Sequence, residues 1–281
     1  MAKGKAVRLS TGTSHRARKR FGQNFLRDQH IIDRIIDSFS ATEKDHLLEI
    51  GPGQGALTKQ LAATGAKLDC IELDRDLADH LSKQFADAEN VSIYQQDILK
   101  FQLTELVKNS ERLRIIGNLP YNISTPVMFH LLKSQTHIED MTFMLQLEVV
   151  ERLAAGVGDK NYGRLGLMVQ YFCQVEHLFN VPATAFSPQP KVNSAIVRLT
   201  PHQQTLNDPQ LKAKDVACLQ MVVRTAFNQR RKTLKNSLKT LIPEETLNKL
   251  PIDCSLRPEN ISLKEYILIS DVLADMTEGS N

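Results

Sequence analysis

Short apolar runs alternate with segments of helical periodicity along most of this chain, and this alternation constrains the fold more than any other feature. The first four runs are Leu47–Ile50, Leu68–Ile71, Val91–Tyr94 and Leu113–Ile116. Strands that alternate with helices predict a parallel sheet covered by helices on both faces. Runs at 141–147, 171–181 and 194–199 are expected to add three strands. Upstream, Asp28 is expected to cap a helix with apolar residues at helical spacing.

Four chemically distinctive residues follow the first four strands. They are Gly51, Glu72, Asp97 and Asn118. In a parallel sheet with helices on both faces, ligands bind outside the carboxyl ends of the strands. We therefore expect these four residues to surround one binding site.

The tetrapeptide Asn118-Leu119-Pro120-Tyr121 suits methylation of an exocyclic amine on a planar base. The lone pair of such an amine is delocalised into the ring. Two acceptors, the Asn118 side-chain oxygen and the Leu119 carbonyl, can hold its N–H bonds and aim the lone pair at an electrophile. Pro120 stiffens the turn, and the ring of Tyr121 offers a face for a base to stack on. The alternative is an ordinary strand-to-loop turn, because Asn and Pro favour turns in general.

The glycine turn after the first strand is ambiguous. Gly51, Gly53 and Ala56 match the dinucleotide pattern G-x-G-x-x-G/A, and Glu72 follows about 20 residues later, where a ribose-binding acid belongs. A nicotinamide-dependent dehydrogenase is therefore a competing interpretation. Glycines permit close approach to any ligand, however, and a carboxylate can bind any ribose diol.

Two acidic residues favour S-adenosylmethionine over a dinucleotide. Glu49 precedes the first glycine by two residues, where a negative charge suits a cationic sulfonium but not a pyrophosphate. Asp97, after the third strand, could accept a hydrogen bond from an adenine amine. The alternative for Asp97 is a helix or turn cap.

Positive charge is concentrated in two segments, although the formal net charge is only +3. Residues 1–30 and residues 211–241 each contain eight Lys or Arg and one acid, which leaves −11 on the rest of the chain. Two basic segments on an acidic body indicate contact with a polyanion at defined places. A disordered tail plus a solvated helix face is the alternative.

The last quarter of the chain lacks strand patterns and is expected to form short helices separated by prolines. One expected helix has an apolar stripe of Leu234, Leu238 and Leu241. Beside it lies a basic stripe of Arg231, Lys235 and Lys239. The predicted division of the chain is a flexible basic arm (1–20), a catalytic domain (21–204) and a small all-helical domain (205–281).

Other features exclude several classes of protein. The four cysteines are far apart and lack a CxxC pair, so we expect reduced thiols and no metal site. No apolar stretch approaches the length of a membrane span, and the basic N-terminus has no apolar signal core. These features favour a cytoplasmic protein that does not contact a membrane.

Several longer motifs resemble those of the ribosomal RNA adenine dimethyltransferases in order and spacing. They are Gln23-Asn24-Phe25-Leu26, Glu49-Ile50-Gly51-Pro52-Gly53, Asn118-Leu119-Pro120-Tyr121-Asn122-Ile123-Ser124, Phe186-Ser187-Pro188-Gln189-Pro190-Lys191-Val192 and the C-terminal Ala226-Phe227-Asn228-Gln229-Arg230-Arg231-Lys232-Thr233-Leu234. The match covers about residues 15 to 270, and the Asn122–Pro126 continuation resembles the bacterial branch.

The resemblance implies an α/β, Rossmann-like methyltransferase that dimethylates N6 of two adjacent adenosines in the 3′-terminal hairpin of 16S rRNA, with a role in small-subunit biogenesis. Tyr121 and Phe186 would sandwich the target adenine. The implied S-adenosylmethionine site comprises Asn24, Leu26, Gly51, Glu72, Asp97 and Asn118. We expect a monomer that contacts RNA through Arg230, Arg231, Lys232, Lys235 and Lys239.

Three rivals make distinguishable predictions. A non-enzymatic assembly factor would bind RNA without transferring a methyl group. A dehydrogenase would bind nicotinamide and would not need Tyr121. A DNA adenine methyltransferase would prefer DNA when DNA and RNA are offered together.

Overall fold

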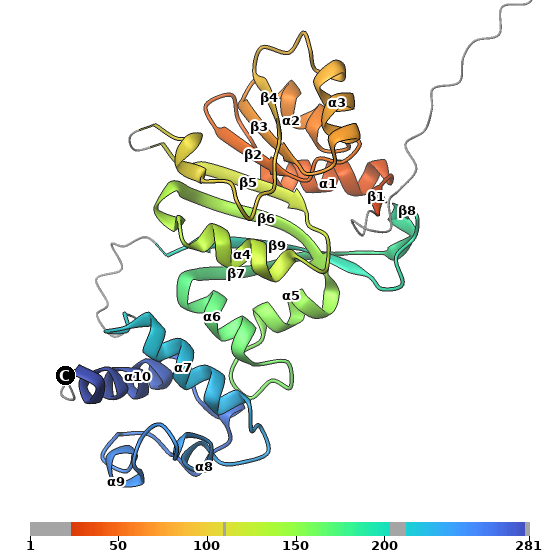
Figure 1. The fold of residues 1–281 in the computed structure, drawn as a ribbon. Helices are drawn as coiled ribbons and strands as arrows, with labels where there is room; N and C mark the ends of the chain where they lie inside the picture. Colours follow the sequence, from red (N-terminus) through yellow and green to blue (C-terminus); the bar gives the residue numbers. More distant parts are fainter. Residues whose placement is uncertain (1–23, 109–110, 203–211, 279–281) are drawn as a thin grey trace, which may run out of the picture.

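The computed structural model describes residues 24–108, 111–202 and 212–278 (Figure 1). The predicted arm, residues 1–20, and the predicted domain boundary at 204/205 lie outside these ranges. The strands are β1 (Phe25–Leu26), β2 (His46–Ile50), β3 (Lys67–Glu72), β4 (Val91–Gln95), β5 (Leu113–Asn118), β6 (Ile138–Gln146), β7 (Cys173–Val181), β8 (Phe186–Ser187) and β9 (Ser194–Pro201). The α-helices are α1 (Gln29–Phe39), α2 (Thr58–Ala63), α3 (Arg75–Gln84), α4 (Ser124–Leu132), α5 (Leu147–Ala154), α6 (Arg164–Phe172), α7 (Val216–Phe227), α8 (Leu234–Leu238), α9 (Glu244–Leu247) and α10 (Leu263–Glu278).

Seven strands form one sheet in the order β4-β3-β2-β5-β6-β9-β7. The first five in this order are parallel, and β9 runs against both of its neighbours, β6 and β7. The expectation of an entirely parallel sheet is therefore wrong for β9, because an apolar run reports burial and not direction. A separate antiparallel pair joins β1 to β8.

Successive residues of the central strands point to opposite faces of the sheet, as expected for a strand period of two. Leu48 and Ile115 pack in one apolar cluster with side chains of α4, α5 and α6. Their neighbours Leu47 and Ile116 pack in a second cluster with side chains of α1 and α2. Helices therefore cover both faces of the sheet, as the alternation of the sequence predicts.

Two strand predictions are displaced at their ends. The predicted strand 141–147 is observed at Ile138–Gln146, and Leu147 begins α5. The predicted strand 171–181 begins at Cys173, since the preceding aromatic residues end α6. In both places the apolar run continues from strand to helix, so hydrophobicity alone does not mark the boundary.

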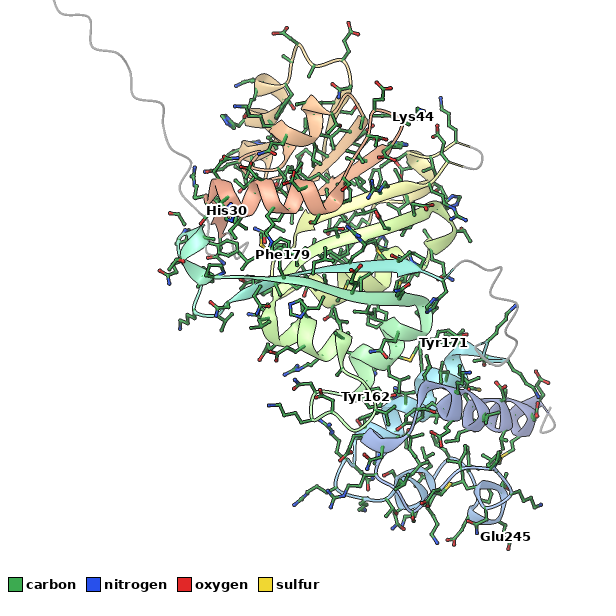
Figure 2. All side chains as sticks on the ribbon, turned by 180° about the vertical axis from the view of Figure 1, so that it is seen from behind. His30, Lys44, Tyr162, Tyr171, Phe179 and Glu245 are labelled. Atoms are coloured by element: carbon green, nitrogen blue, oxygen red, sulfur yellow. The ribbon has the colours of Figure 1, made fainter. Side chains whose placement is uncertain are left out.

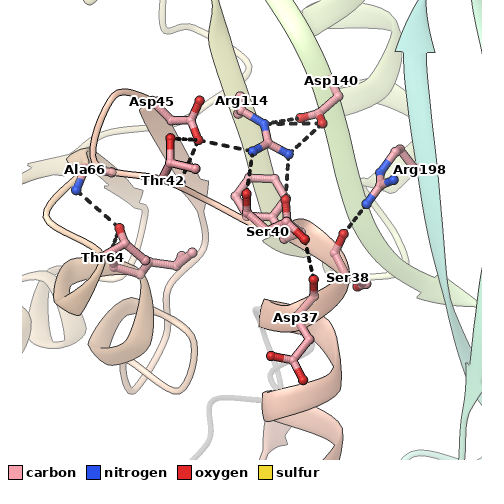
Figure 3. Close-up of polar contacts among 12 residues, drawn as sticks. Asp37, Ser38, Ser40, Thr42, Asp45, Thr64, Ala66, Arg114, Asp140 and Arg198 are labelled. Atoms are coloured by element: carbon pink, nitrogen blue, oxygen red, sulfur yellow. Dashed lines mark hydrogen bonds and ion pairs between the residues drawn. The ribbon is translucent and has the colours of Figure 1, made fainter.

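Two arginines anchor the end of α1 to the sheet (Figure 3). Arg114 of β5 donates to the carbonyls of Phe39 and Ser40 and pairs with Asp140 at 2.9 Å. Arg198 of β9 donates to the carbonyl of Ser38. Positive charge at the carboxyl end of a helix is favourable because that end carries partial negative charge. The anchor fixes the helix that directly follows residues 24–28.

The C-terminal helices enclose a second core with α6 and the loop before it. Tyr162 and Met168 are buried in the same cluster as Leu219 of α7 and Tyr266 of α10. The Tyr162 hydroxyl donates to the Ile261 carbonyl at 3.1 Å. Figure 2 shows Tyr162 and Tyr171 at the junction between the sheet and the C-terminal helices. The second core therefore includes residues that precede the predicted boundary at 204/205.

The predicted single helix with a long basic stripe is not observed. α8 is only five residues long, so Arg231 precedes it and Lys239 follows its last residue. The backbone N–H groups of Leu234 and Lys235 donate to the carbonyls of Leu256 and Cys254. These tertiary bonds replace the helical ones that a longer helix would need.

Among the helices of the described ranges, none combines the length and the apolar character that a membrane span requires.

Candidate active site

A cavity of about 810 Å³ opens at the carboxyl ends of β2, β3 and β5. The chain passes from β2 to β3 on one side and later returns to β5 on the other, so the cavity lies where the strand order reverses. Besides Glu49, Gly53 and Ala56, nine residues proposed from sequence line its wall. They are Asn24, Leu26, Gly51, Glu72, Asp97, Asn118, Leu119, Pro120 and Tyr121.

The glycine loop after β2 adopts a backbone that L side chains rarely adopt. Gly51 and Gly53 have φ of +66° and +61°. A Cβ at Gly53 would lie 3.3 Å from the Phe25 ring. The absence of a side chain at Gly53 therefore permits both the turn and the close packing of β1 over the loop.

Glu72 binds the loop from the end of β3. Its two carboxylate oxygens accept from the backbone N–H groups of Gly53 at 3.0 Å and Asp74 at 2.9 Å. Burial raises the pKa of Glu72, and these hydrogen bonds oppose the shift. Each carboxylate oxygen has a further lone pair, so Glu72 can also accept from the two hydroxyls of a ribose.

Glu49 of β2 is buried on the cavity wall, with 2% of its surface exposed. One carboxylate oxygen accepts from the Thr58 hydroxyl at 2.6 Å. Burial raises the pKa of Glu49 to about 7, against the Thr58 hydrogen bond, and the Glu72 carboxylate adds to the increase. A cation in the cavity would stabilise the ionised form of Glu49.

Asp97 lines the cavity and also caps the turn that follows β4. Its Oδ1 accepts from the backbone N–H of Leu99 at 3.0 Å. The capping alternative considered for this residue is therefore observed. Capping uses one oxygen of the carboxylate, and its position on the wall is compatible with a second role toward a ligand.

Asn118 is the last residue of β5, and its side chain is held by the segment before α1. Its Nδ2 donates to the Asn24 carbonyl at 3.2 Å. A carbonyl oxygen can only accept a hydrogen bond, so the amide atom of Asn118 that faces it is the nitrogen. The Oδ1 atom of Asn118 remains an acceptor for a ligand, as the sequence argument requires.

The turn after Asn118 is closed by hydrogen bonds to the start of α4. The N–H groups of Ile123 and Ser124 donate to the Pro120 carbonyl at 3.0 and 3.1 Å. The Tyr121 hydroxyl forms a 2.8 Å hydrogen bond with the Ser194 hydroxyl of β9. We call residues Asn118 to Tyr121 the acceptor turn. This turn and the Tyr121 ring are both hydrogen-bonded to regular elements, which favours a fixed geometry.

Phe186, the second predicted stacking partner of the base, lies outside the cavity wall. Its side chain is 5% exposed and packs in the apolar cluster with Ile31, Phe179 and Leu26, its partner across the β1–β8 pair. It is not part of the cavity wall. The stacking role of Phe186 stays a prediction, because a base could reach its ring only if the side chain left this cluster.

The five predicted RNA contacts fall into two groups. Arg230 donates to the carbonyls of Lys160 and Tyr162 at 3.1 and 3.0 Å, and Lys235 pairs with Glu244 at 2.6 Å. Both are therefore engaged within the protein. The other three are exposed, and their side chains form no ion pair or hydrogen bond within the part of the chain that the structure describes. We call these three the open cations: Arg231, Lys232 and Lys239.

Sequence reasoning missed two residues that shape the site. Thr58 donates to Glu49 from the first turn of α2, and nothing in its sequence context indicates this partner. Gly117 lies in β5 beside the Ile50 carbonyl, where an added Cβ would be 2.6 Å from the oxygen. A glycine within a strand often marks such a close approach, so Gly117 could have been noticed.

A sequence model described as ribosomal RNA adenine dimethylase matches residues 14–275. The chain belongs to the ribosomal RNA adenine dimethylase family. It is therefore a methyltransferase with S-adenosylmethionine as its methyl donor, as the resemblance implies. The donor set fits that group, since buried Glu49 suits a cation and Glu72 suits a ribose.

Relatives and solved structures agree with this assignment. The chain is 56% identical to ribosomal RNA small subunit methyltransferase A of Pseudomonas fluorescens over 93% of this chain and 95% of the relative. The protein of that name from Pseudomonas aeruginosa is 55% identical, over 93% and 96%. A dimethyladenosine transferase from Plasmodium falciparum has a TM-score of 0.73 at 28% identity, with 90% and 98% covered. The 23S rRNA methyltransferase ErmE has a TM-score of 0.68 at 25% identity, with 89% and 100% covered.

Proposed function

We propose that this enzyme dimethylates N6 of two adjacent adenosines in the 3′-terminal hairpin of 16S rRNA, and so contributes to small-subunit biogenesis. The observation that carries the proposal is the acceptor turn from Asn118 to Tyr121 on the wall of the cavity, in a chain about 55% identical to small-subunit methyltransferases. The large-subunit enzyme ErmE shares the fold at lower identity, which makes the small subunit the better-supported substrate.

The chain's own residues position the base. The adenine leaves its stack, enters the cavity and stacks on Tyr121, and such stacking contributes about 1–3 kcal/mol per base. The Asn118 Oδ1 and the Leu119 carbonyl accept the two N–H bonds of the amine and orient its lone pair. S-adenosylmethionine, when bound, supplies an electrophilic methyl group on a sulfonium. Catalysis then depends on orientation and fixed dipoles more than on acid–base chemistry.

Asn118 is an orienting acceptor and not a general base, because a neutral amide is a very weak base. The proton leaves to water after the methyl group arrives. The singly methylated amine keeps one N–H, so one of the two acceptors can still hold it. The same pocket therefore accommodates a second round of transfer.

RNA contacts outside the cavity come from the open cations and not from all five predicted residues. Arg230 is engaged with the 160–162 loop and fixes the position of the C-terminal helices relative to α6.

The protein acts as a monomer in the cytoplasm, and sedimentation with and without small subunits would test the assembly state.

The test is to incubate the enzyme with labelled S-adenosylmethionine and undermethylated small subunits, and then to map the label. We expect two labelled dimethyladenosines in the 3′-terminal hairpin. Large subunits and duplex DNA serve as matched controls. Label on either control substrate alone would refute the proposed substrate, and RNA binding without label would favour the assembly-factor rival.

A further inference from the structure

Ser194 has a buried hydroxyl that contacts the tyrosine of the acceptor turn. It is the first residue of β9, and its side chain is fully buried. Within the described residues, the 2.8 Å bond to the Tyr121 hydroxyl is the single polar contact of the Ser194 side chain. The next three residues of β9 are buried and apolar, namely Ala195, Ile196 and Val197. An apolar side chain would therefore suit this position if packing were its only requirement.

We propose that Ser194 is a positioning residue for methyl transfer, which it serves by anchoring the ring of Tyr121. The inference rests on the proposed function, in which Tyr121 stacks on the target base. A buried hydroxyl is costly unless it forms a hydrogen bond, so burial of the Ser194 hydroxyl favours its bond to Tyr121.

The anchor restrains the ring at the end opposite the backbone. The Tyr121 hydroxyl lies on the long axis of the ring, and the other end of this axis is held by the turn that is hydrogen-bonded to the start of α4. Rotation about χ1 would swing the hydroxyl away from Ser194 and break the bond. The pair therefore holds the long axis of the ring, and with it the place of the ring beside the acceptor turn, before RNA arrives.

Neighbouring strands make the anchor a rigid one. Ser194 pairs with Gln146 of β6 and Val181 of β7, so β9 is held on both sides at this residue. Tyr121 follows β5, two strands away from β9 in the sheet. The hydrogen bond thus links the acceptor turn to a separate part of the sheet edge.

A double-mutant cycle of Ser194→Ala and Tyr121→Phe tests the inference. Each single variant should lower kcat/KM for small subunits about 3- to 10-fold, the range expected for one neutral hydrogen bond. The KM for S-adenosylmethionine should not change. Because both changes remove the same bond, Ser194→Ala should have no further effect in the Tyr121→Phe background. Losses that multiply in the double variant would overturn the inference.

Thr142→Val is the matched control, because it removes another buried hydroxyl from the adjacent strand β6. The Thr142 hydroxyl has no partner within the described residues, so its loss should leave kcat/KM unchanged. A drop in this variant equal to that of Ser194→Ala would overturn the inference, since any buried hydroxyl of the sheet would then have the same effect.

A spectroscopic measurement separates this inference from the proposed function. Tyrosine labelled at the ring carbon Cζ gives five signals, one for each tyrosine. The Cζ shift responds to hydrogen bonding of the hydroxyl, so Ser194→Ala should move the Tyr121 signal and leave the other four in place. A Tyr121 signal that does not move would overturn the inference whatever the activity. Wild-type enzyme that labels no small-subunit RNA would refute the proposed function instead.

Discussion

Glu49→Gln tests how the cavity selects a cationic ligand. Burial raises the pKa of Glu49 from 4.5 to about 7, so in the free protein this carboxyl is about half protonated at pH 7. A bound cation favours the carboxylate and lowers its pKa. Binding of S-adenosylmethionine at pH 7 should therefore release roughly half a proton from Glu49.

The same linkage gives a pH dependence of affinity. S-adenosylhomocysteine has the same amino and carboxyl groups but a neutral sulfur, so the ratio of the two affinities isolates the sulfonium. For a pKa of about 7, this ratio should rise about tenfold in favour of S-adenosylmethionine between pH 6 and pH 8. Titration calorimetry in buffers of different ionisation enthalpy measures both the affinities and the protons released. Glu49→Gln should show a constant ratio, and an equal rise in the variant would show that Glu49 is not the group that responds to the sulfonium.

The stability of the ligand-free protein should respond in the opposite sense. The folded-state pKa of Glu49 lies above the unfolded value, so its favourable contribution is complete below about pH 4.5 and is lost as the pH rises through about 7. The shift corresponds to at most about 3 kcal/mol in the free energy of unfolding. The midpoint temperature of thermal unfolding should therefore fall less steeply from pH 5 to pH 8 for Glu49→Gln than for the wild type. Parallel curves would contradict this assignment.

Further predictions concern Gly117 of β5 and the open cations. Gly117→Ala places a Cβ 2.6 Å from the Ile50 carbonyl oxygen, so unfolding experiments should show a loss of about 1–3 kcal/mol, and an unchanged unfolding midpoint would contradict the close approach. Replacing the open cations by Gln should reduce the salt dependence of RNA binding by about one unit of log–log slope for each phosphate that the protein no longer neutralises. Lys235→Gln, the matched control, should leave the slope unchanged because its ammonium pairs with Glu244, and an equal reduction would contradict this division.

The position of the site could be predicted because it depends on topology. Parallel strands bring their carboxyl ends to one edge, so residues far apart in sequence, such as Gly51 and Asn118, could be placed together without side-chain detail. The direction of β9 could not be predicted, since an apolar run is compatible with either direction. The hydrogen bond between Tyr121 and Ser194 could not be predicted either, because Ser194 begins β9, the strand whose direction the sequence does not reveal.

The basic stripe was mispredicted because helical periodicity does not show which tertiary hydrogen bonds limit the helix. The segment near Cys254 and Leu256 accepts the N–H groups that begin α8, so the helix cannot extend back to Arg231. The role of Phe186 stays a prediction. A motif resemblance assigns it to the target base, whereas packing against Leu26 and Ile31 buries its ring in this structure.

The proposed mechanism depends on the Asn118 amide oxygen, which orients the target amine. Single-turnover methyl transfer by Asn118→Ala on undermethylated small subunits measures this role, with RNA affinity measured on the same preparation. We predict a fall in rate of about 10²–10³-fold or more, as for the loss of one oriented polar group, with RNA affinity within a few-fold of wild type. Transfer at a rate close to that of the wild type would show that Asn118 does not orient the amine.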